Sequence, residues 1–125
     1  MKKQVLLANA SEIDQTELQS MMDRMGLMLE VVDSAEAACE MAMEAKENGT
    51  PYSLLLLDMD LPVGNFTRQM RFSGYDEPII GIVERLGEPS DYAARDGGCN
   101  DVISRPLTDR NTLCTLQRYI ECAAP

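Results

Sequence analysis

The sequence predicts an α/β fold of the (βα)5 type, a doubly wound parallel five-stranded sheet with helices on both faces. Three observations lead to this prediction. Short apolar runs alternate with amphipathic stretches along the chain, two of the runs are apolar almost throughout, and helix start and stop signals fall between the runs. Strands covered on both faces have such continuous apolar runs, and strand–helix alternation is typical of parallel strands joined by right-handed crossovers.

The short apolar runs are the expected strands, and most of them are bounded by polar or turn residues. The third run, SLLLLD, and the fourth, PIIGIV, are the two that are apolar almost throughout, so we expect both to be covered on both faces. The expected strands are residues 4–8, 27–32, 53–58, 78–83 and 100–104.

The first two expected helices carry clear start and stop signals. The second begins at Ser34, a favourable N-cap, is rich in Ala, Glu and Met, and ends at Gly49. The first covers residues 11–26 and ends at Gly26, a residue type common at helix C-termini. Its apolar residues near helical spacing are Ile13, Leu18, Met21, Met22 and Met25.

The remaining helices are shorter or more weakly marked. The third, about residues 65–72, has few signals, whereas the fourth, about residues 89–96, opens with a proline and closes before two glycines. The fifth lies within residues 108–123. It places four apolar residues on one side, namely Leu113, Leu116, Tyr119 and Ile120.

Length and composition restrict the classes of protein to which the chain can belong. Its 125 residues suffice for one core, so we expect a single domain over residues 1–125. No apolar run approaches the roughly 20 residues needed to cross a bilayer, and the N-terminal apolar stretch is too short for a signal peptide, which favours a cytoplasmic protein. A net charge of −10 argues against nucleic acid or an anionic membrane as a direct partner, because phosphate groups are bound by clustered Lys and Arg.

The third expected strand ends on an acidic residue, Asp58, and Asp60 follows two residues later. In an open parallel α/β sheet the functional crevice lies outside the carboxyl ends of the central strands. An apolar strand that ends in aspartate therefore delivers a carboxylate to that crevice. Taken alone, Asp58 is also consistent with an ordinary polar residue at the end of a strand. The neighbouring motifs therefore decide whether its carboxylate is functional.

Three motifs resemble those of the receiver (CheY-like) domains of two-component signal transduction. LLLLDMDLP at residues 54–62 is similar to the phosphoacceptor strand and its loop, PIIGIV at 78–83 to the fourth strand, and DVISRPL at 101–107 to the fifth strand and its proline turn. The resemblance spans about residues 4–121 and implies the flavodoxin-like strand order 2-1-3-4-5. It also implies that Asp58 takes a phosphoryl group from a kinase phosphohistidine.

The metal site that the resemblance implies is incomplete. The acidic pair that holds magnesium in the family aligns with Asn9 and Ala10, of which the first offers a neutral oxygen and the second none. Asp60 matches the position whose backbone carbonyl is a family ligand. Because Mg2+ favours carboxylate and phosphate oxygens, a site formed by Asn9, Asp58 and Asp60 is expected to bind it weakly or not at all.

The remaining positions around the expected phosphoryl pocket also depart from the family. Val83 replaces the switch hydroxyl and donates no hydrogen bond, and Val102 replaces the switch aromatic residue. Glu84 replaces a small residue, where it would repel a phosphoryl group unless it points into solvent. Arg105 replaces the family lysine, and we expect it to lie close to Asp58 as a fixed counter-ion.

The resemblance further implies a cis peptide bond before Pro106, and the strand-end positions of Asn9, Asp58 and Arg105 predict that these side chains converge in one pocket. We therefore expect a pseudo-receiver: a response-regulator domain that acts through protein contacts, with phosphorylation at Asp58 lost or inefficient. The alternative is a working receiver that a histidine kinase phosphorylates on Asp58. A flavodoxin-like ligand-binding domain is the least supported, because no Gly-rich loop follows the first strand.

The partners that this interpretation implies are proteins. We expect a histidine kinase or another signalling protein, and a homodimer through the face made by the fourth helix, fifth strand and fifth helix, where receivers commonly associate. Candidate contact residues on that face are Tyr92, Leu113 and Tyr119. No enzymatic activity is expected.

Overall fold

Five parallel strands form the sheet, in the order β2-β1-β3-β4-β5. The computed structural model describes residues 3–122. The predicted fold class and strand order are confirmed, and the observed boundaries lie within a few residues of those expected. The strands are β1 Gln4–Ala8, β2 Met28–Val32, β3 Leu54–Asp58, β4 Ile79–Val83 and β5 Asp101–Ser104. The helices are α1 Glu12–Met25, α2 Ala35–Glu47, α3 Phe66–Phe72, α4 Pro89–Asp96 and α5 Arg110–Cys122.

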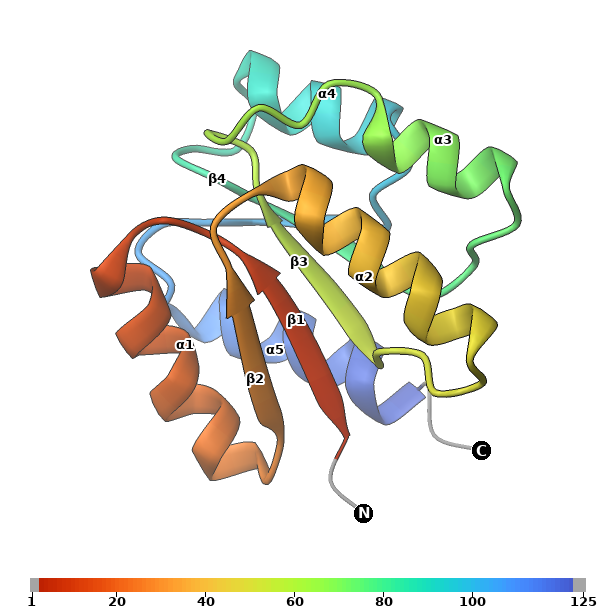
Figure 1. Cartoon of the computed structure of the whole chain (residues 1–125). Helices are drawn as coiled ribbons and strands as arrows, with labels where there is room; N and C mark the ends of the chain where they lie inside the picture. The colour runs from red at the N-terminus through yellow and green to blue at the C-terminus, as the bar shows by residue number, and fades with distance from the viewer. Residues whose placement is uncertain (1–2, 123–125) are drawn as a thin grey trace.

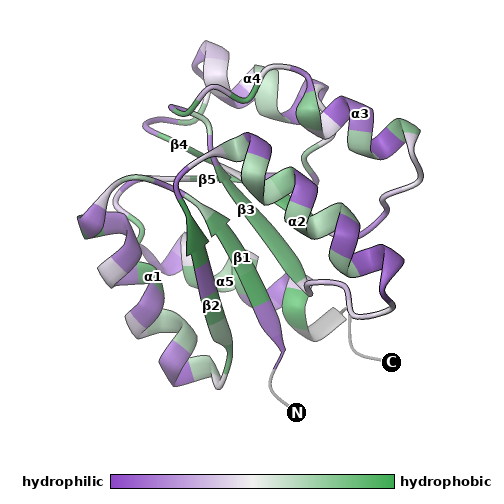
Figure 2. Ribbon diagram, in the orientation of Figure 1, coloured by the Kyte–Doolittle hydropathy of each residue, from purple (hydrophilic) through white to green (hydrophobic). Residues whose placement is uncertain are grey.

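Helices cover both faces of the sheet: α1 and α5 lie on one face, and α2, α3 and α4 lie on the other (Figure 1). Every residue of β3 and β4 is buried, which explains why these two runs are apolar almost throughout. Figure 2 shows the strands as the most hydrophobic elements and the helices as mixtures of polar and apolar residues. Alternate residues of β1, β3, β4 and β5 therefore contribute to two separate cores, one under each helical layer.

The first turn of α1 differs from the expectation. Ile13 is 72% exposed, and the residue that faces the protein at this turn is Asp14, which is 3% exposed. The inward positions of a helix recur three or four residues apart, and Asp14 lies four residues before the buried Leu18. Ser11 caps the helix, since its Oγ accepts a hydrogen bond from the Asp14 amide. An acidic side chain is thereby directed to the carboxyl edge of the sheet.

The cysteines whose side chains are described are free. Burial is the main reason why the pKa of Cys39 is raised to about 12 and that of Cys99 to about 11, so both thiols are protonated and poorly nucleophilic at neutral pH. Among the described residues, no helix combines the length and the apolar character needed to span a bilayer.

Candidate functional site

The carboxyl ends of the strands bring three of the predicted residues together. Asp58 is the last residue of β3, Asn9 follows β1 directly, and Arg105 follows β5 directly. Parallel strands end at the same edge of a sheet, so the three side chains share one pocket at that edge. The backbone of Arg105 is held by a hydrogen bond from its amide to the Val83 carbonyl, and the peptide bond before Pro106 is cis, as expected.

Asn9 is fully buried, and both ends of its amide have partners. Its Nδ2 donates hydrogen bonds to Asp58 Oδ2 at 3.1 Å and to Asp14 Oδ2 at 2.9 Å, and its Oδ1 accepts one from the Ser11 amide at 2.6 Å. This orientation follows from the partners, since a backbone N–H only donates and an ionised carboxylate only accepts. The amide of Asn9 therefore presents hydrogen-bond donors, and not its oxygen, to the two carboxylates.

Asp14 is the site residue that the sequence interpretation missed. Its Oδ2 accepts hydrogen bonds from Arg105 Nη2 at 2.7 Å and from Arg105 Nε at 3.0 Å, in addition to the one from Asn9. Two signals for it were present in the sequence. Asp14 lies one helical turn before Leu18 on the inward side of the helix, and it stands three residues after the N-cap Ser11, the acidic position of a capping box.

Arg105 is the cation of the pocket. Its Nη2 lies 2.7 Å from Asp14 Oδ2 and 3.0 Å from Asp58 Oδ2, and its Nη1 lies 3.4 Å from Asp60 Oδ2. Burial alone would lower the pKa of this guanidinium, but its hydrogen bonds with Asp14 and Asp58 and the charges of both carboxylates outweigh burial and raise it. Arg105 is therefore a permanently charged bridge between two buried carboxylates.

Both carboxylate oxygens of Asp58 are occupied. Oδ1 accepts a hydrogen bond from the Asp60 amide at 2.9 Å, while Oδ2 accepts from Asn9 and contacts Arg105. Only 6% of the Asp58 side chain is exposed, in contrast to 63% of the Asp60 side chain. The carboxylate of Asp58 is thus held in place and largely shielded from solvent.

The other predicted pocket residues lie at its rim or outside it. The side chain of Glu84 is 68% exposed, and its Oε2 lies 3.7 Å from Arg105 Nη1, which favours the solvent-facing orientation over one inside the pocket. Val83 and Val102 are buried in the apolar core beneath α2, α3 and α4. Ala10 is exposed. None of these four side chains supplies a hydrogen-bond donor to Asp58.

The residues around Asp58 do not fit a magnesium ion in this arrangement. Hydrogen-bond donors of Asn9 and Arg105 occupy the space between the carboxylates of Asp14 and Asp58, where an ion would need oxygen ligands. Across the part of the chain that the structure describes, no group of three His, Cys, Asp or Glu side chains is arranged to hold a metal ion. The guanidinium of Arg105 contacts both carboxylates in place of a metal ion.

Two curated plant proteins are similar to the chain in sequence. Two-component response regulator 24 of Arabidopsis thaliana is 29% identical over 120 residues, which cover 94% of this chain and 84% of that protein. Two-component response regulator ORR41 of Oryza sativa subsp. japonica is 30% identical over 94 residues, which cover 72% of this chain and 73% of that protein. No family model matches the chain.

Solved structures of receiver domains share the fold. The receiver domain of a sensor histidine kinase from Pseudomonas aeruginosa PAO1, solved with a magnesium ion in its active-site cleft, superposes with a TM-score of 0.79 at 24% identity and covers 97% of this chain and 99% of its own. The receiver domain of the response regulator Ssk1 from Saccharomyces cerevisiae, solved in complex with the histidine phosphotransfer protein Ypd1, gives a TM-score of 0.77 at 19% identity, with 99% and 92% covered.

Proposed function

Because the chain belongs to the receiver-domain family of two-component response regulators, we propose that it is a receiver-like domain that signals through protein contacts, with phosphorylation of Asp58 lost or inefficient. The observation that carries the proposal is the occupied carboxylate of Asp58. Attack on a phosphoryl group needs a carboxylate oxygen that the phosphodonor can reach, and only 6% of the Asp58 side chain is exposed. Here the Asp60 amide, Asn9 and Arg105 already engage both oxygens, and Asp14 fixes Arg105 in place.

The balance of charge in the pocket supports the same proposal. A phosphoryl group on Asp58 would place nearly two negative charges beside Asp14 and Asp60 where the carboxylate now carries one, with Arg105 as the single cation in contact with them among the described residues. Phosphoryl transfer depends on cations that neutralise the developing charge. Magnesium is bound in the Pseudomonas aeruginosa receiver. In this chain we expect it to bind weakly, because donors face the carboxylates where ligands would be required.

The absence of a switch supports signalling without phosphate. Val83 offers no hydroxyl that could turn towards a phosphoryl oxygen, and Val102 offers no aromatic ring that could change its position. Both side chains are packed in the core, so a charge placed on Asp58 would find no polar group to move at either of these two positions. Partner binding is therefore expected to be the same with and without a phosphodonor.

A working receiver remains the second candidate function. The observation that favours it is the 3.0 Å contact between Arg105 Nη2 and Asp58 Oδ2, because a guanidinium binds phosphate oxygens in a bidentate manner. In that case Arg105 would leave Asp14 and follow the phosphoryl group, and Asp58 would be the phosphoacceptor of a histidine kinase.

The partners belong to two-component signalling. Receiver domains interact with histidine kinases or phosphotransfer proteins, as the Ypd1 complex illustrates, and we assign a partner of that kind to this chain. It acts as a signalling module in the cytoplasm and not as an enzyme. The net charge of −10 leaves nucleic acid and anionic membranes unfavourable as direct partners.

The wild-type protein is expected to respond little to phosphodonors. Incubation with acetyl phosphate, or with beryllium fluoride as a phosphoryl mimic, in magnesium buffer should leave the intact mass and the amide NMR spectrum almost unchanged, because Asp58 is held by donors and magnesium is poorly accommodated. The matched control is Asp58→Asn, which removes the acceptor. Magnesium-dependent modification of the wild type, abolished in Asp58→Asn, would establish the working receiver instead.

A homodimer through α4, β5 and α5 completes the proposed function. Tyr92 of α4 is 63% exposed and Leu86, in the loop before α4, is 54% exposed, whereas Leu113 and Tyr119 of α5 are half-buried and pack partly against the core. Sedimentation velocity is expected to give a dimer at micromolar concentration, and Tyr92→Arg is expected to give a monomer because it introduces charge at an apolar contact. A wild type that stays monomeric at every concentration contradicts this expectation.

A further inference from the structure

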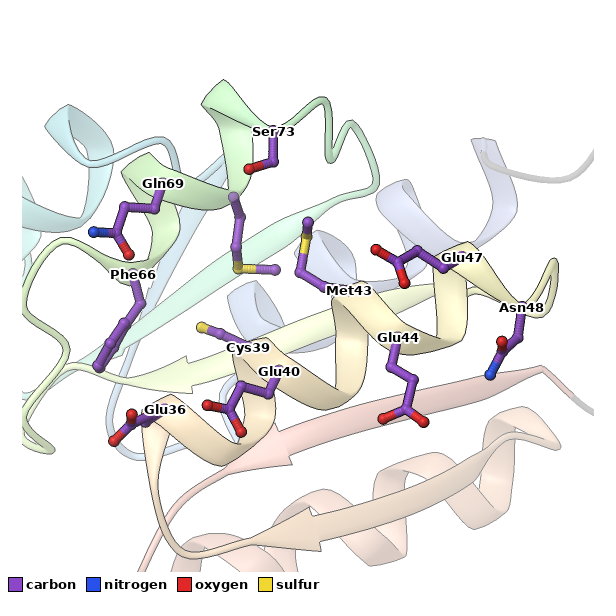
Figure 3. Close-up of a pocket in the computed structure, with 11 residues that line it drawn as sticks. Glu36, Cys39, Glu40, Met43, Glu44, Glu47, Asn48, Phe66, Gln69 and Ser73 are labelled. Carbon is purple, nitrogen blue, oxygen red and sulfur yellow. The ribbon is translucent and has the colours of Figure 1, made fainter.

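A surface groove of about 780 Å³ lies between α2 and α3, away from the Asp58 pocket (Figure 3). Its floor is apolar and is made by four residues: Met70 and Cys39 are almost fully buried, and Met43 and Phe66 are half-buried. In Figure 3, Cys39 and Met43 of α2 project towards α3. Methionine side chains are flexible and polarizable, so a floor of this kind adapts to apolar side chains of different shapes.

Four glutamates of α2 line the same groove: Glu36, Glu40, Glu44 and Glu47. All four are exposed, and none takes part in the ion pairs formed among the described residues. Of the residues that the structure describes, neither lysine nor arginine lines the groove. Like charges four residues apart on a helix are unfavourable, so cationic side chains of a partner would relieve the repulsion along this helix.

We infer that this groove binds a basic amphipathic helix of a partner protein. The apolar floor accommodates side chains that recur every three or four residues on one face of such a helix, and Lys or Arg on its flank pair with the α2 glutamates. The 13 residues of α2 span about 20 Å, which matches a partner helix of about three to four turns. Charge steers the encounter, and apolar burial supplies the affinity.

Charge complementarity selects this occupant over the others. A second copy of the chain that docked through the same groove would bring the same four glutamates to the interface, so the two grooves would repel each other. Nucleic acid is repelled for the same reason. A neutral apolar ligand would bury the floor but would leave the glutamate stripe uncompensated. Binding in this groove requires no change at Asp58, because the residues that line the groove are not those that contact Asp58.

A designed peptide tests the chemistry directly. The probe is a fluorescein-labelled peptide of about 14 residues made of leucine and lysine, with the leucines on one helical face. Its controls are a peptide of the same composition with scattered leucines and a peptide with glutamate in place of lysine. We expect the probe to bind with micromolar affinity by fluorescence anisotropy, and both controls to bind about tenfold more weakly or not at all. Absence of probe binding, or equal binding of the scattered peptide, overturns the inference.

Matched variants locate the binding surface. Glu40→Lys combined with Glu44→Lys should weaken probe binding about tenfold, and Met43→Gln should weaken it without any change of charge. The control is Glu17→Lys with Asp23→Lys on α1, which changes the net charge equally and should leave binding unchanged. Thermal unfolding checks that each variant is folded, and amide shifts of the wild type should map to α2 and α3. Three results would overturn the assignment. The two double variants could lose equal probe affinity, or the amide shifts could be confined to elements other than α2 and α3. The third is self-association of the protein that Glu40→Lys with Glu44→Lys alters.

Discussion

Arg105→Ala is expected to lower the free energy of unfolding by about 3 kcal/mol or more, the usual cost of removing one partner from a buried ion pair. The side chains of Asp14 and Asp58 are 4% and 6% exposed, and the variant would leave both buried without their cation. Asn9 would remain between them and can donate hydrogen bonds, but it carries no charge. Urea unfolding followed by circular dichroism measures the loss as a lower midpoint at constant slope.

Two further variants separate this effect from a general loss of surface charge. Arg118→Ala removes an exposed arginine that pairs with Asp101 at 3.3 Å, and it should change stability by about 0.5 kcal/mol or less. Arg105→Ala combined with Asp14→Asn removes one buried charge together with its cation and should recover part of the lost stability. Equal effects of Arg105→Ala and Arg118→Ala would show that the buried network contributes little.

Much of the fold could be predicted because the relevant signals are local. The continuous apolar runs at 53–58 and 78–83 identify β3 and β4, and strand–helix alternation then requires a parallel sheet. The convergence of Asn9, Asp58 and Arg105 could also be predicted, since each stands where a parallel strand ends, and parallel strands end at one edge.

The partners of Arg105 could not be predicted in the same way. Asp14 meets Arg105 across 91 residues of sequence, and that contact depends on how α1 packs against the sheet. The family motif places the acidic pair at Asn9 and Ala10, whereas the carboxylate in this pocket comes from Asp14, four residues after Ala10. The orientation of the Asn9 amide is likewise set by tertiary partners, the Ser11 amide on one side and two carboxylates on the other. The periodicity of the sequence carries no information about the Asp14–Arg105 contact or about the orientation of the Asn9 amide.

The network around Arg105 has a consequence for signalling. Arg105 forms its shortest contact with Asp14 and not with Asp58, so a phosphoryl group on Asp58 would compete with Asp14 for the guanidinium. Such competition lowers the free energy with which Arg105 could stabilise a phosphoryl group, because the buried carboxylate of Asp14 loses its partner whenever Arg105 moves away. Asp14 therefore acts as an internal anion that holds Arg105, and with it the pocket, in one arrangement.

Introduction of an acidic pair, Asn9→Asp with Ala10→Asp, is expected to create a magnesium site beside Asp58. The first substitution replaces the donors between Asp14 and Asp58 by a third carboxylate, and the second adds a carboxylate at the exposed rim. Without a cation these groups repel one another, so the variant should be less stable than the wild type. Magnesium at about 100 times the dissociation constant would then add about 2.7 kcal/mol, measured as a rise of several degrees in Tm, whereas the wild type should hardly respond.

The metal response and the phosphate response are expected to separate in this variant. Addition of Asp58→Asn to the double substitution should weaken the magnesium effect, and sodium chloride at equal ionic strength should not reproduce it. Acetyl phosphate should modify Asp58 in the variant more than in the wild type, because magnesium now neutralises charge at the acceptor. Amide shifts should nevertheless stay near the pocket, since Val83 has no hydroxyl and remains packed in the core. Amide shifts that reach α4 and α5 would show that the domain keeps a working switch. An equal rise in the Tm of the wild type with magnesium would show that Asn9 already permits an ion to bind.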